Sequence, residues 1–140
     1  MIVEIEFRNN GVIDSLTHAP APAHFFDNLH REFSRANREA RNISLISLQS
    51  MNCEHVTEFQ LTALARAILR HLRSDEFFTR ISESGFWIYV KGDSVAAEKL
   101  ASRIMQDEDS RWRCSIVECQ PTTTIDEWIH AIDLQHFSAD

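Results

Sequence analysis

The chain has 140 residues, of which 44% are hydrophobic and 25% are charged, and its formal net charge is −7 at pH 7. This length predicts one domain over residues 1–140, and the hydrophobic content supports a packed core and excludes a disordered chain. The negative charge disfavours a general nucleic-acid binder and a protein of anionic membrane surfaces, because both are more often basic.

The first half of the chain is predicted to alternate strands with helices. Residues 2–7 alternate apolar and charged side chains, which is typical of a strand and not of a signal peptide. Pro20 and Pro22 precede an apolar stripe that predicts a helix over about residues 23–40. A strand is predicted over residues 43–48. The run Thr57-Glu58-Phe59-Gln60 has the pattern of a capping box and opens a second helix, which is predicted to extend to about residue 72.

The second half is predicted to begin with a β-hairpin formed by residues 77–81 and 86–90. A third helix is predicted over about residues 95–106 and a further strand over residues 112–119. The run Thr124-Ile125-Asp126-Glu127 is a second capping box that opens a last helix. This order predicts the α+β class, with helices that cover a mainly antiparallel sheet.

Two further patterns favour a cytoplasmic protein. No apolar run is long enough to span a membrane. The three cysteines lack the spacing of a metal site, so we expect reduced thiols and no structural metal.

The run Asp14-Ser15-Leu16-Thr17, followed by Pro20 and Phe25, resembles the opening motif of the GGDEF (diguanylate cyclase) family. The order of later matches, which include Cys114-Ser115-Ile116 near the end of the chain, agrees with that family. This resemblance implies the nucleotidyl-cyclase-like fold, a ferredoxin-like palm with a mainly antiparallel sheet flanked by helices.

The same resemblance indicates that the reaction centre is degenerate. The family has Gly-Gly-Asp-Glu-Phe at its signature hairpin, where this chain has Ser82-Glu83-Ser84-Gly85-Phe86. The family also has a metal-binding aspartate at the position of Gln49, and the loop from Cys53 to Phe59 is shorter than the family's by roughly eight residues, a large change for a connection.

These departures mark vestigial active-site positions, which are Gln49, Ser82, Glu83, Ser84 and Gly85. An amide and a glycine lack the negative charge that Mg²⁺ requires, and phosphoryl transfer depends on metal-assisted charge stabilisation. We therefore expect no catalytic residue, no metal and no cofactor, and we expect that the chain is not an enzyme. A solvated turn is the favoured interpretation of Glu83, and a weak metal ligand is the alternative.

A candidate ligand site precedes the hairpin. Arg73-Ser74-Asp75-Glu76 resembles the family's inhibitory Arg-x-x-Asp site, which binds cyclic di-GMP. Glu76 could replace the aspartate, with Asp75 as a second candidate, and Arg73 could recognise phosphate through its planar guanidinium. The simpler interpretation is that Arg73 is an ordinary charge at the end of a helix.

Two arginine stripes and an aromatic pair also leave alternatives open. Each stripe is predicted to follow one helix, and the stripes consist of Arg31, Arg35, Arg38 and Arg41, and of Arg66, Arg70 and Arg73. Salt-bridged, solvated faces are the favoured interpretation, and a surface for an acidic partner or a phosphate ligand is the alternative. Trp87 and Tyr89 are expected to be buried under a helix, with an exposed patch as the alternative.

The sequence therefore predicts a catalytically inactive GGDEF-like domain that serves as a regulatory or protein-interaction module in bacterial cyclic di-GMP signalling. Its expected partner is another protein or a second copy of itself, and we expect no nucleic-acid or membrane partner. The alternative is a sensor that binds cyclic di-GMP or another nucleotide through Arg73 and Glu76.

Overall fold

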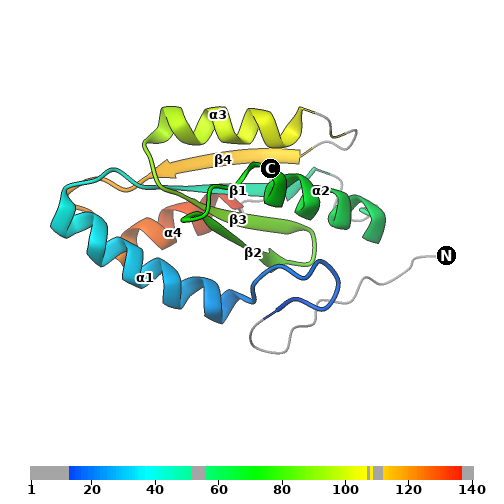
Figure 1. Cartoon of the computed structure of the whole chain (residues 1–140), viewed down its shortest axis with the longest axis horizontal. Coiled ribbons are helices and arrows are strands. Elements are labelled where there is room, and N and C mark those ends of the chain that lie inside the picture. Colours follow the sequence, from blue (N-terminus) through cyan, green and yellow to red (C-terminus); the bar gives the residue numbers. More distant parts are fainter. Residues whose placement is uncertain (1–12, 52–55, 107, 109–111, 137–140) are drawn as a thin grey trace.

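A four-stranded antiparallel sheet forms the centre of the molecule (Figure 1). The computed structural model describes residues 13–51, 56–106, 108 and 112–136. The strands lie in the order β2-β3-β1-β4. In chain order the elements are α1 (Pro22–Glu39), β1 (Ser44–Ser50), α2 (Glu58–His71), β2 (Phe77–Ser82), β3 (Gly85–Val90), α3 (Ser94–Met105), β4 (Trp112–Glu118) and α4 (Ile125–His136).

This order and these bounds confirm the predicted α+β class and the elements from the first helix onward. The strand predicted over residues 2–7 lies outside the described residues, as do Cys53 and most of the loop that was expected to be short.

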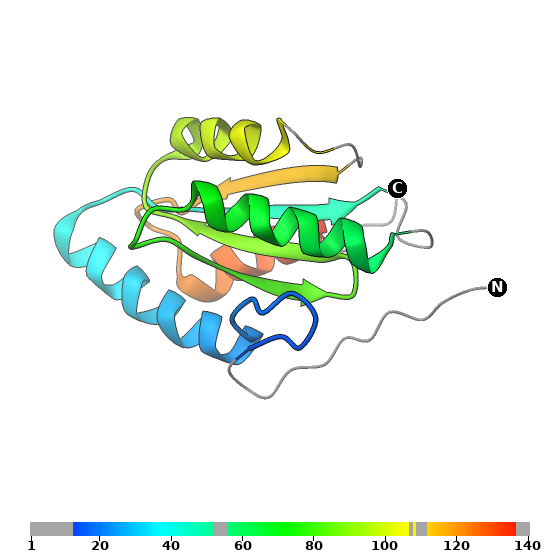
Figure 2. The same ribbon diagram turned by 45° about the vertical axis from the view of Figure 1, so that its right-hand side comes forward.

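Helices α2 and α3 cover one face of the sheet, and α2 crosses the front of the sheet in Figure 2. Successive side chains of a strand point to opposite faces, so the even-numbered apolar residues of β1 and β3 meet these two helices. The shared core includes Ile46, Leu48, Phe86, Ile88, Leu61, Leu64, Ile68, Leu100 and Ile104.

Helices α1 and α4 cover the opposite face. The odd-numbered residue Leu45 packs there with Phe25, Leu29, Trp128 and Ile132. Trp87 and Tyr89 are buried in the same cluster, which confirms that the aromatic pair belongs to the core. The ring of Tyr89 stacks on Phe77 with a centroid separation of 4.6 Å.

Local capping explains where two of the helices begin. Thr57 and Gln60 exchange hydrogen bonds at the start of α2, with Thr57 N donating to Gln60 Oε1 at 2.9 Å and Gln60 N donating to Thr57 Oγ1 at 3.1 Å. Thr124 and Glu127 form the same reciprocal pair before α4. Both predicted capping boxes are therefore confirmed. Within the described part of the chain, no helix combines the length and the apolarity needed to cross a membrane.

Candidate functional site

The end of β1 and the β2–β3 turn bring the predicted vestigial positions together. Gln49 lies directly opposite Gly85 in the antiparallel pairing of β1 with β3. Gln49 Nε2 donates to Ser84 Oγ at 2.9 Å, and the backbone N–H of Ser50 donates to the carbonyl oxygen of Ser84 at 3.0 Å. Ser82 pairs with Gly85 across the hairpin. An amide, two hydroxyl groups and a glycine thus occupy this part of the site.

Glu83, at the tip of the same turn, is exposed. Its backbone carbonyl accepts a hydrogen bond from Arg80 Nη2 at 2.8 Å. Among the residues that the structure describes, no three His, Cys, Asp or Glu side chains are grouped so that they could hold a metal ion. Glu83 therefore lies on an exposed turn.

His136, the last residue of α4, fills the space beside Gly85. Its Nδ1 is hydrogen-bonded to Ser47 Oγ, and its Nε2 lies 3.3 Å from Ser82 Oγ. A Cβ atom on Gly85 would lie 2.7 Å from His136 Nε2 and 2.5 Å from Gln49 Oε1, which is closer than real Cβ contacts. A side chain at this position would therefore have to displace the Gln49 amide and the His136 imidazole.

His136 was not among the residues that the sequence predicted for this site. A signal was present, because Trp128, Ile132 and His136 follow one another at intervals of four residues and all three are buried. The contact with Ser47 spans 89 positions, however, and depends on how α4 docks against the sheet.

Burial and, second, the nearby charge of Arg113 lower the pKa of His136 to about 4. Arg113 Nη2 donates to the backbone carbonyl of His136 at 2.9 Å, which satisfies one carbonyl at the end of α4. The imidazole is consequently neutral at pH 7, and a neutral ring can pair with two hydroxyl groups without a buried charge.

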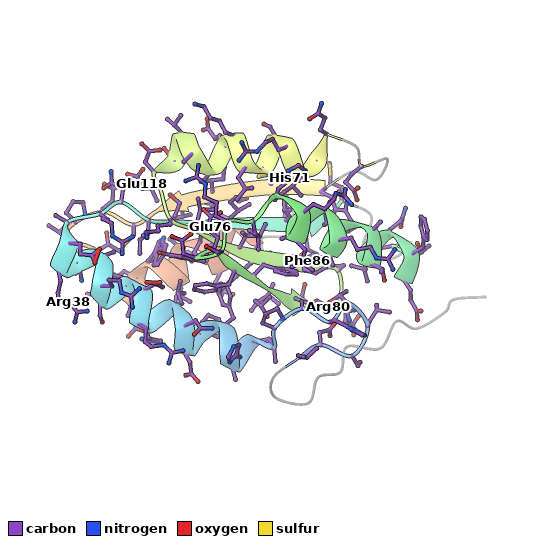
Figure 3. The ribbon with its side chains drawn as sticks, in the orientation of Figure 1. Arg38, His71, Glu76, Arg80, Phe86 and Glu118 are labelled. Atoms are coloured by element: carbon purple, nitrogen blue, oxygen red, sulfur yellow. The ribbon has the colours of Figure 1, made fainter. Side chains whose placement is uncertain are left out.

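A buried ion pair joins the segment before α1 to the hairpin. Asp14 Oδ1 lies 3.3 Å from Arg80 Nη1, and the two side chains are 1% and 0% exposed. Asp14 Oδ2 also accepts hydrogen bonds from Thr17 N at 2.9 Å and Thr17 Oγ1 at 2.7 Å. Figure 3 shows Arg80 beside the loop that leads into α1. Asp14 and Thr17 were quoted from the sequence as motif residues, but their connection to Arg80 emerges only in the fold.

The carboxylates of the Arg73-x-x-Glu76 segment have partners within the protein. Glu76 accepts hydrogen bonds from the backbone N–H groups of Arg73 at 3.0 Å and Lys91 at 3.1 Å. Asp75 Oδ2 lies 2.9 Å from Lys91 Nζ, and this hydrogen bond to Lys91 holds the pKa of Asp75 below its ordinary value. Arg73 is exposed. Both acids thus help to join this turn to the end of β3.

The two arginine stripes differ. On α1, Arg35 pairs with Glu32 at 3.4 Å, and beyond its end Arg41 pairs with Glu39 at 2.6 Å, which confirms the salt-bridged interpretation for these residues. On α2, Arg66 and Arg70 are exposed and form no ion pair with another described residue. They line an open hollow of about 470 Å³, which also includes Phe59, Thr62 and Ala63.

No protein-family model matches the sequence, and no curated protein matches it. The structure is similar to the GGDEF domain of DgcB from Caulobacter crescentus, solved in complex with c-di-GMP. The TM-score is 0.79, with 15% sequence identity over 95% of this chain and 92% of that chain. The chain has the GGDEF-domain fold.

Two Pseudomonas aeruginosa proteins show the same GGDEF fold. The GGDEF domain of YfiN (TpbB) matches with a TM-score of 0.74 and 18% identity, over 89% of this chain and 86% of that chain. The diguanylate cyclase SiaD, solved with its activator SiaC, matches with a TM-score of 0.76 and 17% identity, over 86% of this chain and 55% of that chain. The predicted nucleotidyl-cyclase-like fold is thereby confirmed.

Proposed function

We propose that this protein is a catalytically inactive GGDEF-like domain that serves as a regulatory or protein-interaction module in bacterial cyclic di-GMP signalling. One observation carries the proposal. Gln49 and Gly85, which align with the family's metal-binding carboxylates, face each other across one strand pair, so the two substitutions affect the same point in space.

The chemistry of these two residues explains the proposed inactivity. Mg²⁺ is a hard cation that binds carboxylate oxygens, and the transfer of a nucleotidyl group requires metal ions to neutralise the developing charge on phosphate. The amide of Gln49 is neutral and its nitrogen donates to Ser84. Gly85 has no side chain to replace the missing ligand.

His136 adds a steric reason. Its imidazole lies where a side chain on Gly85 would begin, and it is bonded to Ser47 and Ser82. An acidic residue at position 85 would therefore require the imidazole of His136 to move. The missing carboxylates and the docked α4 both support a domain that keeps the packed core of the fold and does not catalyse the reaction.

The test is an assay of GTP turnover with Mg²⁺ or Mn²⁺, beside SiaD with its activator SiaC as a positive control. We expect no cyclic dinucleotide product and no metal-dependent GTP binding by calorimetry. Metal-dependent formation of cyclic di-GMP by the purified chain would refute the proposed inactivity.

The regulatory role has a separate test. Crosslinking in the native cell, followed by purification of the chain, is expected to recover a cyclase or phosphodiesterase of cyclic di-GMP. The comparison with SiaD supports this expectation, since that GGDEF protein was solved with a protein activator. Repeated recovery of no component of this signalling system would contradict the role.

A cyclic di-GMP sensor is the second candidate. It is favoured by the exposed position of Arg73 and by the complex of the DgcB domain with c-di-GMP. Titration with cyclic di-GMP, repeated with Arg73→Ala, tests it. Absence of binding, or binding that Arg73→Ala leaves unchanged, would exclude this site. Because Asp75 and Glu76 already bind Lys91, the interaction module is the better-supported function.

A further inference from the structure

Helix α2 presents an exposed face with both apolar and basic residues. Phe59 is 82% exposed and Leu69 is 59% exposed, although large apolar side chains of this kind are usually buried. Phe59 and Arg66 are seven residues apart and therefore lie on one side of the helix, and Arg70 follows one turn later. Arg66 and Arg70 form no ion pair with another described residue and place two positive charges on this face of an acidic chain, although Glu58 and Glu108 line the same hollow.

Helix α4 presents the opposite chemistry. It contains three acidic residues, Asp126, Glu127 and Asp133, and no lysine or arginine. Leu134 is 58% exposed on the same helix. Glu127 and Leu134 are seven residues apart, which again places them on one side of the helix.

The two faces match when the helices run antiparallel. Phe59 then lies opposite Leu134, and the equal spacing of seven residues places Arg66 opposite Glu127. Arg70 lies opposite residue 123 in this register, just before α4 and within about one helical turn of Asp126. Helices of 14 and 12 residues extend about 21 and 18 Å, so either can cover the other over most of its length.

One molecule cannot join its own two faces, because α2 and α4 lie on opposite sides of the sheet. In Figure 1 α2 lies in front of the strands and α4 behind them. We infer that the basic face of α2 binds the acidic face of α4 from a second copy of this chain. The contact is heterologous, so it joins molecules head to tail into a closed ring or an open chain.

The arginines of the α1 stripe are less suitable for binding the acidic face of α4. Its Arg35 is already paired with Glu32, and Arg41 is paired with Glu39. The inference gives the proposed interaction module a surface and a partner, and it rests on that function. The following experiment uses no nucleotide and no cyclase, so its failure would leave the GTP and crosslinking results unaffected.

Sedimentation velocity and light scattering over a range of protein concentrations at low salt test the inference. The wild-type chain is expected to form species that grow beyond a dimer as its concentration rises. Raising the salt from about 0.05 to about 0.5 M should weaken this association by about tenfold, because exposed charges are then screened. A monomer at all concentrations, or a species that stops at a dimer, would overturn the head-to-tail arrangement.

Charge exchange identifies the two faces. Arg66→Glu with Arg70→Glu, and separately Asp126→Lys with Glu127→Lys, should each weaken self-association by about tenfold or more. When the two variants are mixed in equal amounts, association should return, because each altered face then meets a complementary one. Failure of the mixture to associate would overturn the proposed pairing.

Two controls complete the design. Arg35→Glu with Arg38→Glu makes the same change of charge on α1 and should leave association unchanged; an equal loss of association would attribute the effect to total charge and overturn the inference. Phe59→Ser, at a side chain that the fold does not bury, should weaken association while the thermal unfolding curve by circular dichroism stays the same. Unchanged association of Phe59→Ser would exclude α2 as the contact.

Discussion

Replacing Gly85 with alanine is expected to destabilise the fold by about 1–3 kcal/mol, the usual cost of inserting a methyl group into a packed site. The new Cβ would lie 2.5 Å from Gln49 Oε1 and 2.7 Å from His136 Nε2. The amide of Gln49 can rotate away, with loss of its hydrogen bond to Ser84. The imidazole is only 1% exposed, and its displacement would break its bonds to Ser47 and Ser82, which places the cost toward the upper end of this range.

A double-mutant cycle measured by urea unfolding tests this reasoning. His136→Ala removes the obstructing ring, so Gly85→Ala should cost at least about 1 kcal/mol less in that background than in the wild type. His130→Ala is the matched control, because His130 is exposed on the same helix and its removal should not reduce the cost. Additive effects of Gly85→Ala and His136→Ala would show that the imidazole does not restrict position 85.

Three other changes test further features of the structure. The pKa of His136 is about 4 in the folded protein and 6.5 in its ordinary state, so between these values only the unfolded chain binds the proton. The contribution of the neutral imidazole to the free energy of unfolding is therefore present above pH 6.5 and is lost as the pH falls toward 4. We expect the free energy of unfolding to fall by about 2 kcal/mol more between pH 7 and pH 5 in the wild type than in His136→Ala; equal pH dependence would contradict this. Asp14→Ala removes the buried ion pair with Arg80 and should cost about 3–5 kcal/mol in urea unfolding, and a loss below about 1 kcal/mol would show that this ion pair does not stabilise the fold. Thr57→Ala removes the cap of α2 and should cost about 1 kcal/mol, with the exposed Thr122→Ala as a neutral control.

Much of the fold was predictable because its signals are local. The capping box at Thr57 depends on residues three positions apart, and the stripe of α2 depends on the 3.6-residue period of a helix. The hairpin followed from two apolar runs around a short turn. Such patterns fix the type of each element without information about its neighbours.

The candidate site was predictable only in part. The resemblance to the GGDEF family located Gln49 and the turn at residues 82–85, and the pairing of β1 with β3 confirmed that they meet. Asp75 and Glu76 were proposed as ligand-binding residues, but sequence order could not reveal that the fold brings Lys91 into contact with both of them.

The sequence by itself determined the order of the elements, the α+β class and the absence of carboxylates at two positions of the signature site, since these depend on residue type and short-range periodicity. Only the tertiary structure decided that His136 closes the space beside Gly85, that Asp14 pairs with Arg80, and that the faces of α2 and α4 lie on opposite sides of the sheet. The physical reason is that these contacts join residues 51 to 89 positions apart or helices on separate faces, and their geometry depends on how the helices pack on the sheet, which no local pattern encodes.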